Sequence, residues 1–230
     1  MFVPPGLNPV VYVVHVVLGV STALFVLGAL FAVKGSRFHR RAGQGFAIAM
    51  GVAAVTALVF MFSRPSNYAI CSALLALYGL GAGILTLRRR HGALRALELV
   101  LFAIPWIVFL FFTLVGVTLA TTPNPAPPTA MPASFVIAAF ALFLAISDVA
   151  YVRSRDISRN RRLCRHALRF GVAAAEVVRA PLITFAPRLF GEISLDVYFL
   201  APMLLIPAIY FLARPSWVKA GLNGPAAEAG

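Results

Sequence analysis

Ionisable side chains within long apolar stretches are the positions at which this chain could carry out chemistry. Four of them have the spacing of a single helix face: Arg165, Arg169, Glu176 and Arg179. At about 100° per residue, the four fall within about 80° of one another. Because an ionised group inside a membrane costs about 2.5–3.5 kcal/mol by insertion scales, we expect this stripe to face the protein interior or a membrane interface, with Glu176 paired to Arg179.

Three further ionisable residues lie in or beside apolar stretches. His15 and Asp196 are expected at a similar depth near one membrane surface, where a His–Asp pair could relay protons or hold a tautomer for a ligand. The simpler alternative is a histidine bonded to a backbone carbonyl and an aspartate that reaches outward. Asp148 lies about one turn inside the opposite surface. We expect it to be buried, where it would neutralise Arg169 or His166.

Three of the four histidines share a local pattern. His39, His91 and His166 each lie in an arginine-rich cluster that precedes an apolar stretch. Two histidines from facing helices are common axial ligands of a b-type haem, so this end of the molecule is a candidate site for one haem or a quinone. The alternative is that these histidines lie at the interface and face lipid. The neighbouring arginines repel metal cations, and no metal site is predicted.

No motif of a known catalytic centre is present. The sequence contains no H-E-x-x-H, no G-x-S-x-G and no phosphate-binding P-loop. Two carboxylates that could act together in one hydrolytic site are not found either. The sequence therefore predicts no catalytic residue, and whether the protein is an enzyme stays open.

Long apolar stretches alternate with short arginine clusters along the chain. Of the 230 residues, 61 % are hydrophobic and 12 % are charged, which leaves too little polar surface for a soluble globular domain. Since a membrane helix needs about 20 apolar residues, the pattern predicts an all-α, polytopic transmembrane helical bundle of seven spans. The expected spans are Val10–Val33, Gly45–Phe62, Tyr68–Leu87, Leu97–Ala120, Ala133–Val152 and Ile193–Leu212, with a seventh inside Ala167–Phe190. The alternative is six spans plus one amphipathic helix at the interface.

Basic residues lie almost entirely on one side of these spans. The predicted loops on that side carry 17 of the 20 lysines and arginines, and loops of this kind stay in the cytoplasm. The sequence thus predicts a bacterial plasma (inner) membrane protein with its N-terminus outside. Residues 1–220 are expected to form one transmembrane domain and 221–230 a flexible tail. Topology and contact with anionic lipid headgroups explain the net charge of +13, and nucleic-acid binding is not predicted.

Two glycines predict where helices pack closely. Gly79 and Gly83 form a G-x-x-x-G pattern inside an apolar span, which allows two helix backbones to approach each other. The contact could lie inside one protomer or between two subunits. Other membrane subunits or a second copy of the chain are therefore the expected protein partners.

The first basic loop resembles the motif of a known family. It reads Lys34-Gly-Ser-Arg-Phe-His39-Arg40-Arg-Ala-Gly43 and follows a span that contains a histidine. The order K-G-x-x-x-H-R-x-x-G is similar to that of a bacterial family of polytopic membrane proteins of unknown function. The third basic loop agrees in part, but residues 160–164 read N-R-R-L-C where that family has H-R-R-W-M. The resemblance implies a plasma-membrane helical bundle and brings no established reaction with it.

Three functional hypotheses follow. The leading one is an accessory component of a membrane complex that packs through the glycine pair. The second is a membrane redox protein that binds one b-type haem or a quinone near His39, His91 and His166. The third is a small-molecule or proton-coupled carrier, whose path would pass four buried polar residues: His15, Glu176, Arg179 and Asp196.

Overall fold

The computed structural model describes residues 7–63, 66–88, 93–123, 129–154, 158–190 and 195–207. Within these residues all regular secondary structure is helical, which confirms the all-α prediction. The helices are α1 (Pro9–Phe31), α2 (Arg37–Phe60), α3 (Asn67–Leu87), α4 (Ala93–Thr121), α5 (Ala130–Arg153), α6 (Arg159–Phe190), α7 (Leu195–Leu200) and the 3-10 helix η1 (Ala201–Leu204). The first five are each long and apolar enough to cross a membrane.

A serine cap explains why α2 begins earlier than the apolar pattern suggests. The Ser36 side chain accepts a hydrogen bond from the backbone N–H of His39 (3.1 Å). A side-chain oxygen at this position satisfies an N–H group that the first helical turn leaves without a partner. α2 therefore starts at Arg37 rather than at Gly45, and the basic residues of this cluster form its first turns.

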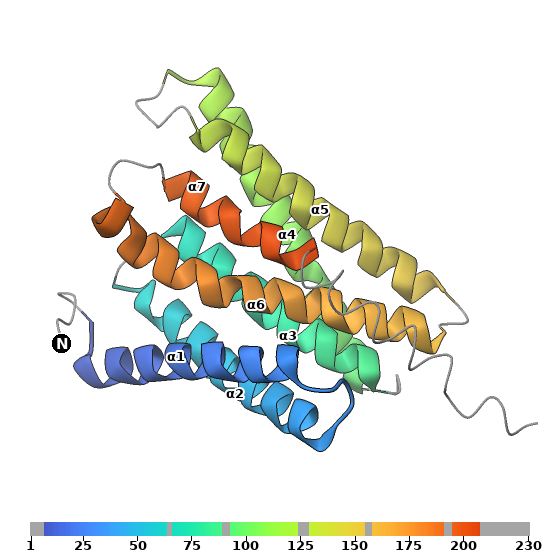
Figure 1. Ribbon diagram of the computed structural model, residues 1–230. Coiled ribbons are helices and arrows are strands. Elements are labelled where there is room, and N and C mark those ends of the chain that lie inside the picture. Colours follow the sequence, from blue (N-terminus) through green and yellow to red (C-terminus); the bar gives the residue numbers. More distant parts are fainter. Residues whose placement is uncertain are drawn as a thin grey trace, which may run out of the picture.

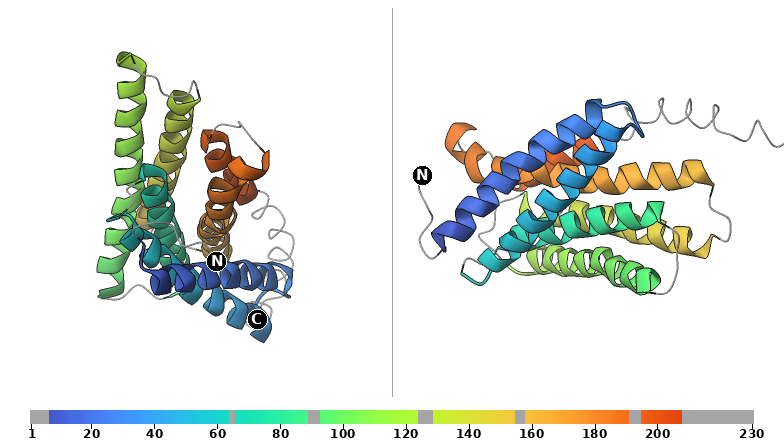
Figure 2. Two further views of the ribbon diagram at one scale, coloured as in Figure 1. Left: turned by 90° about the vertical axis from the view of Figure 1, so that its left-hand side faces the viewer. Right: turned by 90° about the horizontal axis from the view of Figure 1, so that it is seen from below.

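α3 and α6 form the centre of the bundle. The hairpin of α1 and α2 lies on one side of them and the hairpin of α4 and α5 on the other (Figure 1, Figure 2). Eleven of the 21 residues of α3 are buried, whereas in α1 only Thr22 is buried and the other residues are at least partly exposed. The largest apolar cluster joins α3 to α4, α5 and α6 around Leu75, Ile137 and Leu144.

α6 runs antiparallel to α3 along most of its length. Toward one end of α3, Gly83 lies against Phe170 of α6, and toward the other end Ser72 bonds to Glu176. The 32 residues of α6 form one continuous helix (Figure 1). The helix expected within Ala167–Phe190 is present, and it begins earlier, inside the third basic cluster.

The last helical segment differs from the expected one. A single helix was predicted over Ile193–Leu212, but in the described residues 195–207 the six-residue α7 is followed directly by the 3-10 helix η1. Pro202 lies in the first turn of η1 and lacks the N–H group that a continuing α-helix would use. Seven spans are therefore not confirmed. Residues 193, 194 and 208–212 of the predicted span lie outside the described part of the chain.

Candidate functional site

A buried carboxylate on α5 joins two arginines of α6. Asp148 Oδ1 lies 2.6 Å from Arg169 Nη2 and 2.8 Å from Arg165 Nη2. The Tyr78 hydroxyl of α3 donates a hydrogen bond to Asp148 Oδ2 (2.7 Å). Asp148 and Arg169 are each only 1 % exposed. The structure thus brings Asp148 to Arg169, one of the two partners expected for it.

Both arginines make further contacts with α5. Arg169 donates to Ser147 Oγ (2.5 Å) and to the Leu144 carbonyl (3.3 Å). The guanidinium carbon of Arg165 lies 3.8 Å from the ring centroid of Tyr151, which is a cation–π contact. Even so, Nε and Nη1 of Arg165 and of Arg169 have no hydrogen-bond partner in the part of the chain that the structure describes. Both guanidinium groups are held in place while part of their donor capacity is unused.

Gly79 and Gly83 explain how α6 comes so close to α3. A Cβ atom on Gly79 would lie 2.6 Å from the carbonyl oxygen of Arg169 and 3.0 Å from the backbone nitrogen of Ala173. A Cβ atom on Gly83 would overlap the ring of Phe170. Only glycine permits this approach of two backbones. The G-x-x-x-G pair is thus occupied by a helix of the same chain, the first of the two alternatives for it.

A second buried ion pair lies further along α6. Glu176 accepts hydrogen bonds from Arg179, three residues on, and from the Ser72 hydroxyl of α3. Glu176 is 2 % exposed and Arg179 is fully buried. All four residues of the predicted stripe therefore face the protein interior. The Glu176–Arg179 pair is neutral, whereas the two arginines at Asp148 leave an excess of positive charge.

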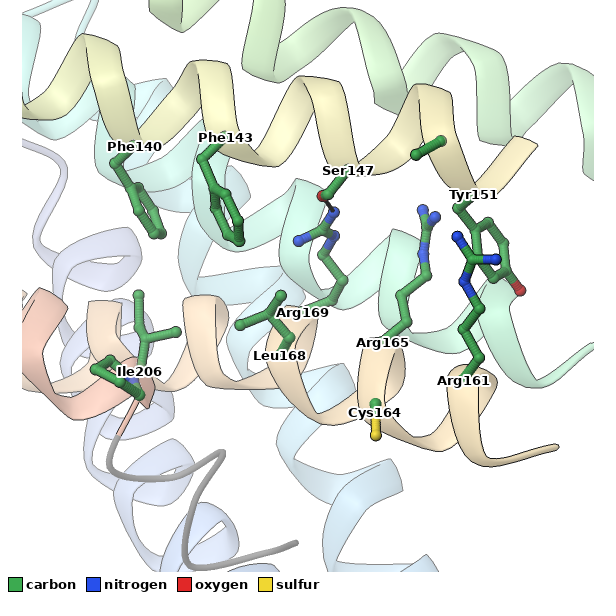
Figure 3. A pocket seen from close by; sticks show the side chains of 12 residues that line it. Phe140, Phe143, Ser147, Tyr151, Arg161, Cys164, Arg165, Leu168, Arg169 and Ile206 are labelled. Carbon is green, nitrogen blue, oxygen red and sulfur yellow. Dashed lines mark hydrogen bonds between the residues drawn. The ribbon is translucent and has the colours of Figure 1, made fainter. Parts of the chain in front are cut away.

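A groove of about 520 Å³ runs between α5 and α6 beside Asp148 (Figure 3). Arg161, Arg165 and Arg169 line one end of it, and Phe140 and Phe143 line the other. Figure 3 shows the three arginine side chains extended toward α5 and the two phenylalanine rings extended toward α6. We call this space the arginine groove. It combines a positively charged end with apolar walls.

The two described histidines of the basic clusters bond to backbone carbonyls. His39 Nδ1 lies 3.0 Å from the carbonyl oxygen of Ala29, and His166 Nδ1 lies 3.0 Å from that of Gly83. A carbonyl oxygen only accepts, so Nδ1 of each ring carries a proton and Nε2 is not used in this hydrogen bond. The two imidazoles are close enough to interact electrostatically. His91 lies outside the described residues.

His15 bonds to α2. Its Nδ1 lies 3.1 Å from the carbonyl oxygen of Ala53 and 2.9 Å from Thr56 Oγ1. This is the arrangement of the simpler alternative, in which the imidazole is held by a backbone carbonyl. The side chain of Asp196 lies outside the described part of the structure, so a His15–Asp196 pair stays a prediction.

The K-G-x-x-x-H-R motif forms the turn between α1 and α2. Gly35 has a φ of 81°, in the left-handed region that favours glycine. Lys34 Nζ donates to the carbonyls of Ala29 (3.0 Å) and Leu30 (2.7 Å), and burial lowers the pKa of this ammonium group. His39 donates to the same carbonyl of Ala29. The motif therefore closes the end of α1 and holds the hairpin, which gives it a structural role.

Sequence reasoning missed the residues that complete the site: Ser147, Tyr151, Phe140 and Phe143 of α5, Arg161 of α6, and Tyr78 and Ser72 of α3. Arg161 lies four residues before Arg165 and lines the groove, so extending the helical stripe by one turn would have found it. Tyr78 and Ser72 bond to the two buried carboxylates. Nothing in their spacing singles them out, because their partners are determined by how α3 packs against α5 and α6.

The arrangement is suited to binding negative charge. Guanidinium groups donate paired hydrogen bonds to carboxylate and phosphate oxygens. Among the described residues there is no group of three or more His, Cys, Asp or Glu side chains that could hold a metal ion. Comparisons with protein-family profiles, with curated protein sequences and with solved structures find no match for this chain.

Proposed function

We propose that this protein is a membrane-embedded binding protein or carrier for an anionic ligand, which it holds in the arginine groove. The observation that supports this proposal is the charge balance of the groove. Arg161, Arg165 and Arg169 line it, and among the described residues the one carboxylate that pairs with any of the three is Asp148, which contacts Arg165 and Arg169. Buried guanidinium groups with unused N–H donors are costly in a medium of low dielectric constant, so a bound anion would stabilise them.

The second ion pair favours a path along α6. Glu176 and Arg179 lie seven and ten residues beyond Arg169, about 10 and 15 Å at 1.5 Å per residue. Buried ionisable residues inside a membrane commonly mark the route of an ion or a substrate. Of the three hypotheses from the sequence, the carrier is the one that these residues support best.

We further propose that α6 crosses the membrane as a sixth span. It lies antiparallel to α3, and its contacts reach from Gly83 near one end of α3 to Ser72 near the other. If α3 crosses the membrane, α6 passes through the same depth. Its charges are then shielded by α3 and α5 instead of facing lipid. With the N-terminus outside, the arginine-rich start of α6 is cytoplasmic, as the distribution of basic residues predicts.

The test of anion binding is a thermal-unfolding panel on the full chain in a non-ionic detergent. Anionic, neutral and cationic compounds are compared, each as short-chain and long-chain members. We expect anions to raise the melting temperature, and neutral or cationic analogues of the same size to leave it unchanged. Arg161→Gln should reduce the anion effect, whereas Arg159→Gln, which removes an exposed arginine outside the groove, should not. A panel in which no anion shifts the wild-type protein contradicts the proposal.

A redox role is a second candidate because of the two described histidines. His39 and His166 both anchor Nδ1 on a helix carbonyl and keep Nε2 as a possible ligand, the arrangement that commonly orients metal-ligating histidines. We propose an absorption spectrum of the purified protein, air-oxidised and then dithionite-reduced, as the test. A Soret band that shifts on reduction and disappears in His166→Ala would support one b-type haem. A colourless preparation, made with haem available during expression, would exclude haem binding.

The accessory-component hypothesis now needs a different surface. Gly79 and Gly83, on which it depended, lie against α6 of the same chain. A partner or second copy would have to use another face, such as the exposed side of α1. Co-purification of a defined membrane partner would favour this hypothesis over the carrier.

A further inference from the structure

The arginine groove has a charged end and an apolar end. Arg161 and Arg169 are eight residues apart on α6, about 12 Å along the helix axis. Figure 3 shows Phe143 and Phe140 beyond Arg169, on the side away from Arg161. The charged end lies at the start of α6, beside the basic cluster, and the apolar end lies nearer the middle of the bundle. A lipid in the adjacent leaflet has the same order of charged headgroup and hydrocarbon.

The charged end holds buried donors that lack acceptors. In the part of the chain that the structure describes, Nε and Nη1 of Arg165 and of Arg169 have no hydrogen-bond partner. Arg169 is only 1 % exposed and lines the groove. Buried polar atoms of this kind are rare in folded proteins. These nitrogen atoms expose almost no surface, so a carboxylate or phosphate reaches them when the arginine side chain moves toward the groove, where one guanidinium group can donate two hydrogen bonds to it.

Building on the proposed anion binding, we infer that the ligand is a lipid anion with a single hydrocarbon chain. Its carboxylate or phosphate headgroup binds the three arginines, and its chain lies along Phe143 and Phe140. The groove volume of about 520 Å³ is within the range of about 300–1,000 Å³ for small-molecule sites, which suits one chain better than the two of a phospholipid. Phe143 is 53 % exposed, so the chain can enter from the side of the bundle.

The test measures how binding depends on the headgroup and on the chain. The full-length protein in a non-ionic detergent is titrated with oleate, methyl oleate, acetate and inorganic phosphate, with binding read by native mass spectrometry and by thermal unfolding. We expect oleate to bind at least tenfold more tightly than methyl oleate, since the ester lacks the negative charge that strengthens hydrogen bonds from guanidinium groups. Acetate and phosphate should bind more weakly than oleate.

Two matched pairs of exposed positions locate the ligand without disturbing the core. Arg161→Gln should weaken oleate binding, and Arg159→Gln should not, because Arg159 does not line the groove. Phe143→Ala should weaken oleate binding without changing the binding of acetate. Ile146→Ala is its control, since Ile146 is an exposed residue of the same helix that does not line the groove.

The outcomes separate this inference from the proposed function. If acetate or phosphate binds as tightly as oleate and Phe143→Ala has no effect, the ligand is a soluble anion: the lipid inference is wrong and the anion-binding function stands. If methyl oleate binds as tightly as oleate, the site recognises hydrocarbon alone. The lipid-anion inference and the anion-binding function are then both wrong. If none of the four probes binds to the wild-type protein, both are overturned as well.

Discussion

Asp148 and Arg169 connect two helices that are not closely packed. Oδ1 of Asp148 on α5 and Nη2 of Arg169 on α6 are 2.6 Å apart, although the arginine groove lies between these helices. On its other side, α6 is in backbone contact with α3 at Gly79. α6 is therefore fixed against α3 by close packing and connected to α5 through charged side chains. This asymmetry leaves room for a ligand between α5 and α6.

Asp148→Asn removes the negative charge that pairs with Arg165 and Arg169. We expect stability to fall by about 3–5 kcal/mol, as when one partner of a buried ion pair is removed. Tyr78→Phe, which removes one hydrogen bond to the same carboxylate, should cost less, about 1.5–3 kcal/mol. Thermal or denaturant unfolding in detergent measures both changes. Equal stability of Asp148→Asn and the wild-type protein would mean that the carboxylate is not neutralising buried charge.

The same variant has an effect on ligand binding. Asp148 competes with a bound anion for Arg165 and Arg169, so Asp148→Asn should bind oleate more tightly than the wild-type protein does. Oleate should also restore part of the lost thermal stability, because it supplies the missing negative charge. Weaker oleate binding in Asp148→Asn would show that the anion does not use these arginines.

Glu176→Gln should destabilise the protein through Arg179. Arg179 is fully buried and pairs with Glu176, so the variant leaves a buried positive charge at a cost of about 3–5 kcal/mol. The double variant Glu176→Gln with Arg179→Met removes both charges and should recover most of that loss. A double-mutant cycle of unfolding midpoints measures the coupling. If the two changes were simply additive, the ion pair would have no energetic role.

The double variant also distinguishes a structural role of the Glu176–Arg179 pair from a role in transport. If the pair lies on a carrier path, the variant with both residues replaced should fold normally but lose flux of the ligand into proteoliposomes. Normal flux in a well-folded double variant would show that Glu176 and Arg179 only stabilise α6.

Gly79→Ala should separate α6 from α3. The new Cβ atom would lie 2.6 Å from a backbone oxygen of α6, which cannot move without shifting the helix, and overpacking of this kind costs about 1–3 kcal/mol. Gly51→Ala is the control, because a Cβ atom at Gly51 meets nothing within 4 Å. Gly51→Ala should raise the stability slightly, because alanine has a higher helix propensity than glycine. A comparison of the two melting temperatures tests the contact, and equal values would contradict it.

Single cysteines test the orientation of the chain in the membrane. In a background that replaces Cys71 and Cys164, Ser63→Cys follows α2 and Ser158→Cys precedes α6, both at exposed positions. We expect a membrane-impermeant maleimide to label Ser63→Cys in intact cells and Ser158→Cys only after lysis. Labelling of Ser158→Cys in intact cells would contradict the proposed orientation.

The sequence was sufficient for the helices and for the polar stripe of α6. Apolar length predicted the five long helices, and a 3.6-residue period placed Arg165, Arg169, Glu176 and Arg179 on one buried face. The sequence could not show which helices meet. Tyr78 and Ser72 became members of the site only because Gly79 and Gly83 bring α3 against α6. The change to a 3-10 helix around Pro202 was also missed, since hydropathy does not register the lost N–H group.

The most direct test of the central claim is to map where a lipid anion binds. The full-length protein in detergent is irradiated with a photoreactive fatty acid that carries a diazirine in its chain, and the labelled residues are identified by mass spectrometry. We predict labelling around Phe140, Phe143 and Leu168, suppressed by excess oleate and reduced in Arg161→Gln. Labelling confined to the outer faces of α1 and α4, insensitive to oleate, would contradict a lipid-anion site in the arginine groove.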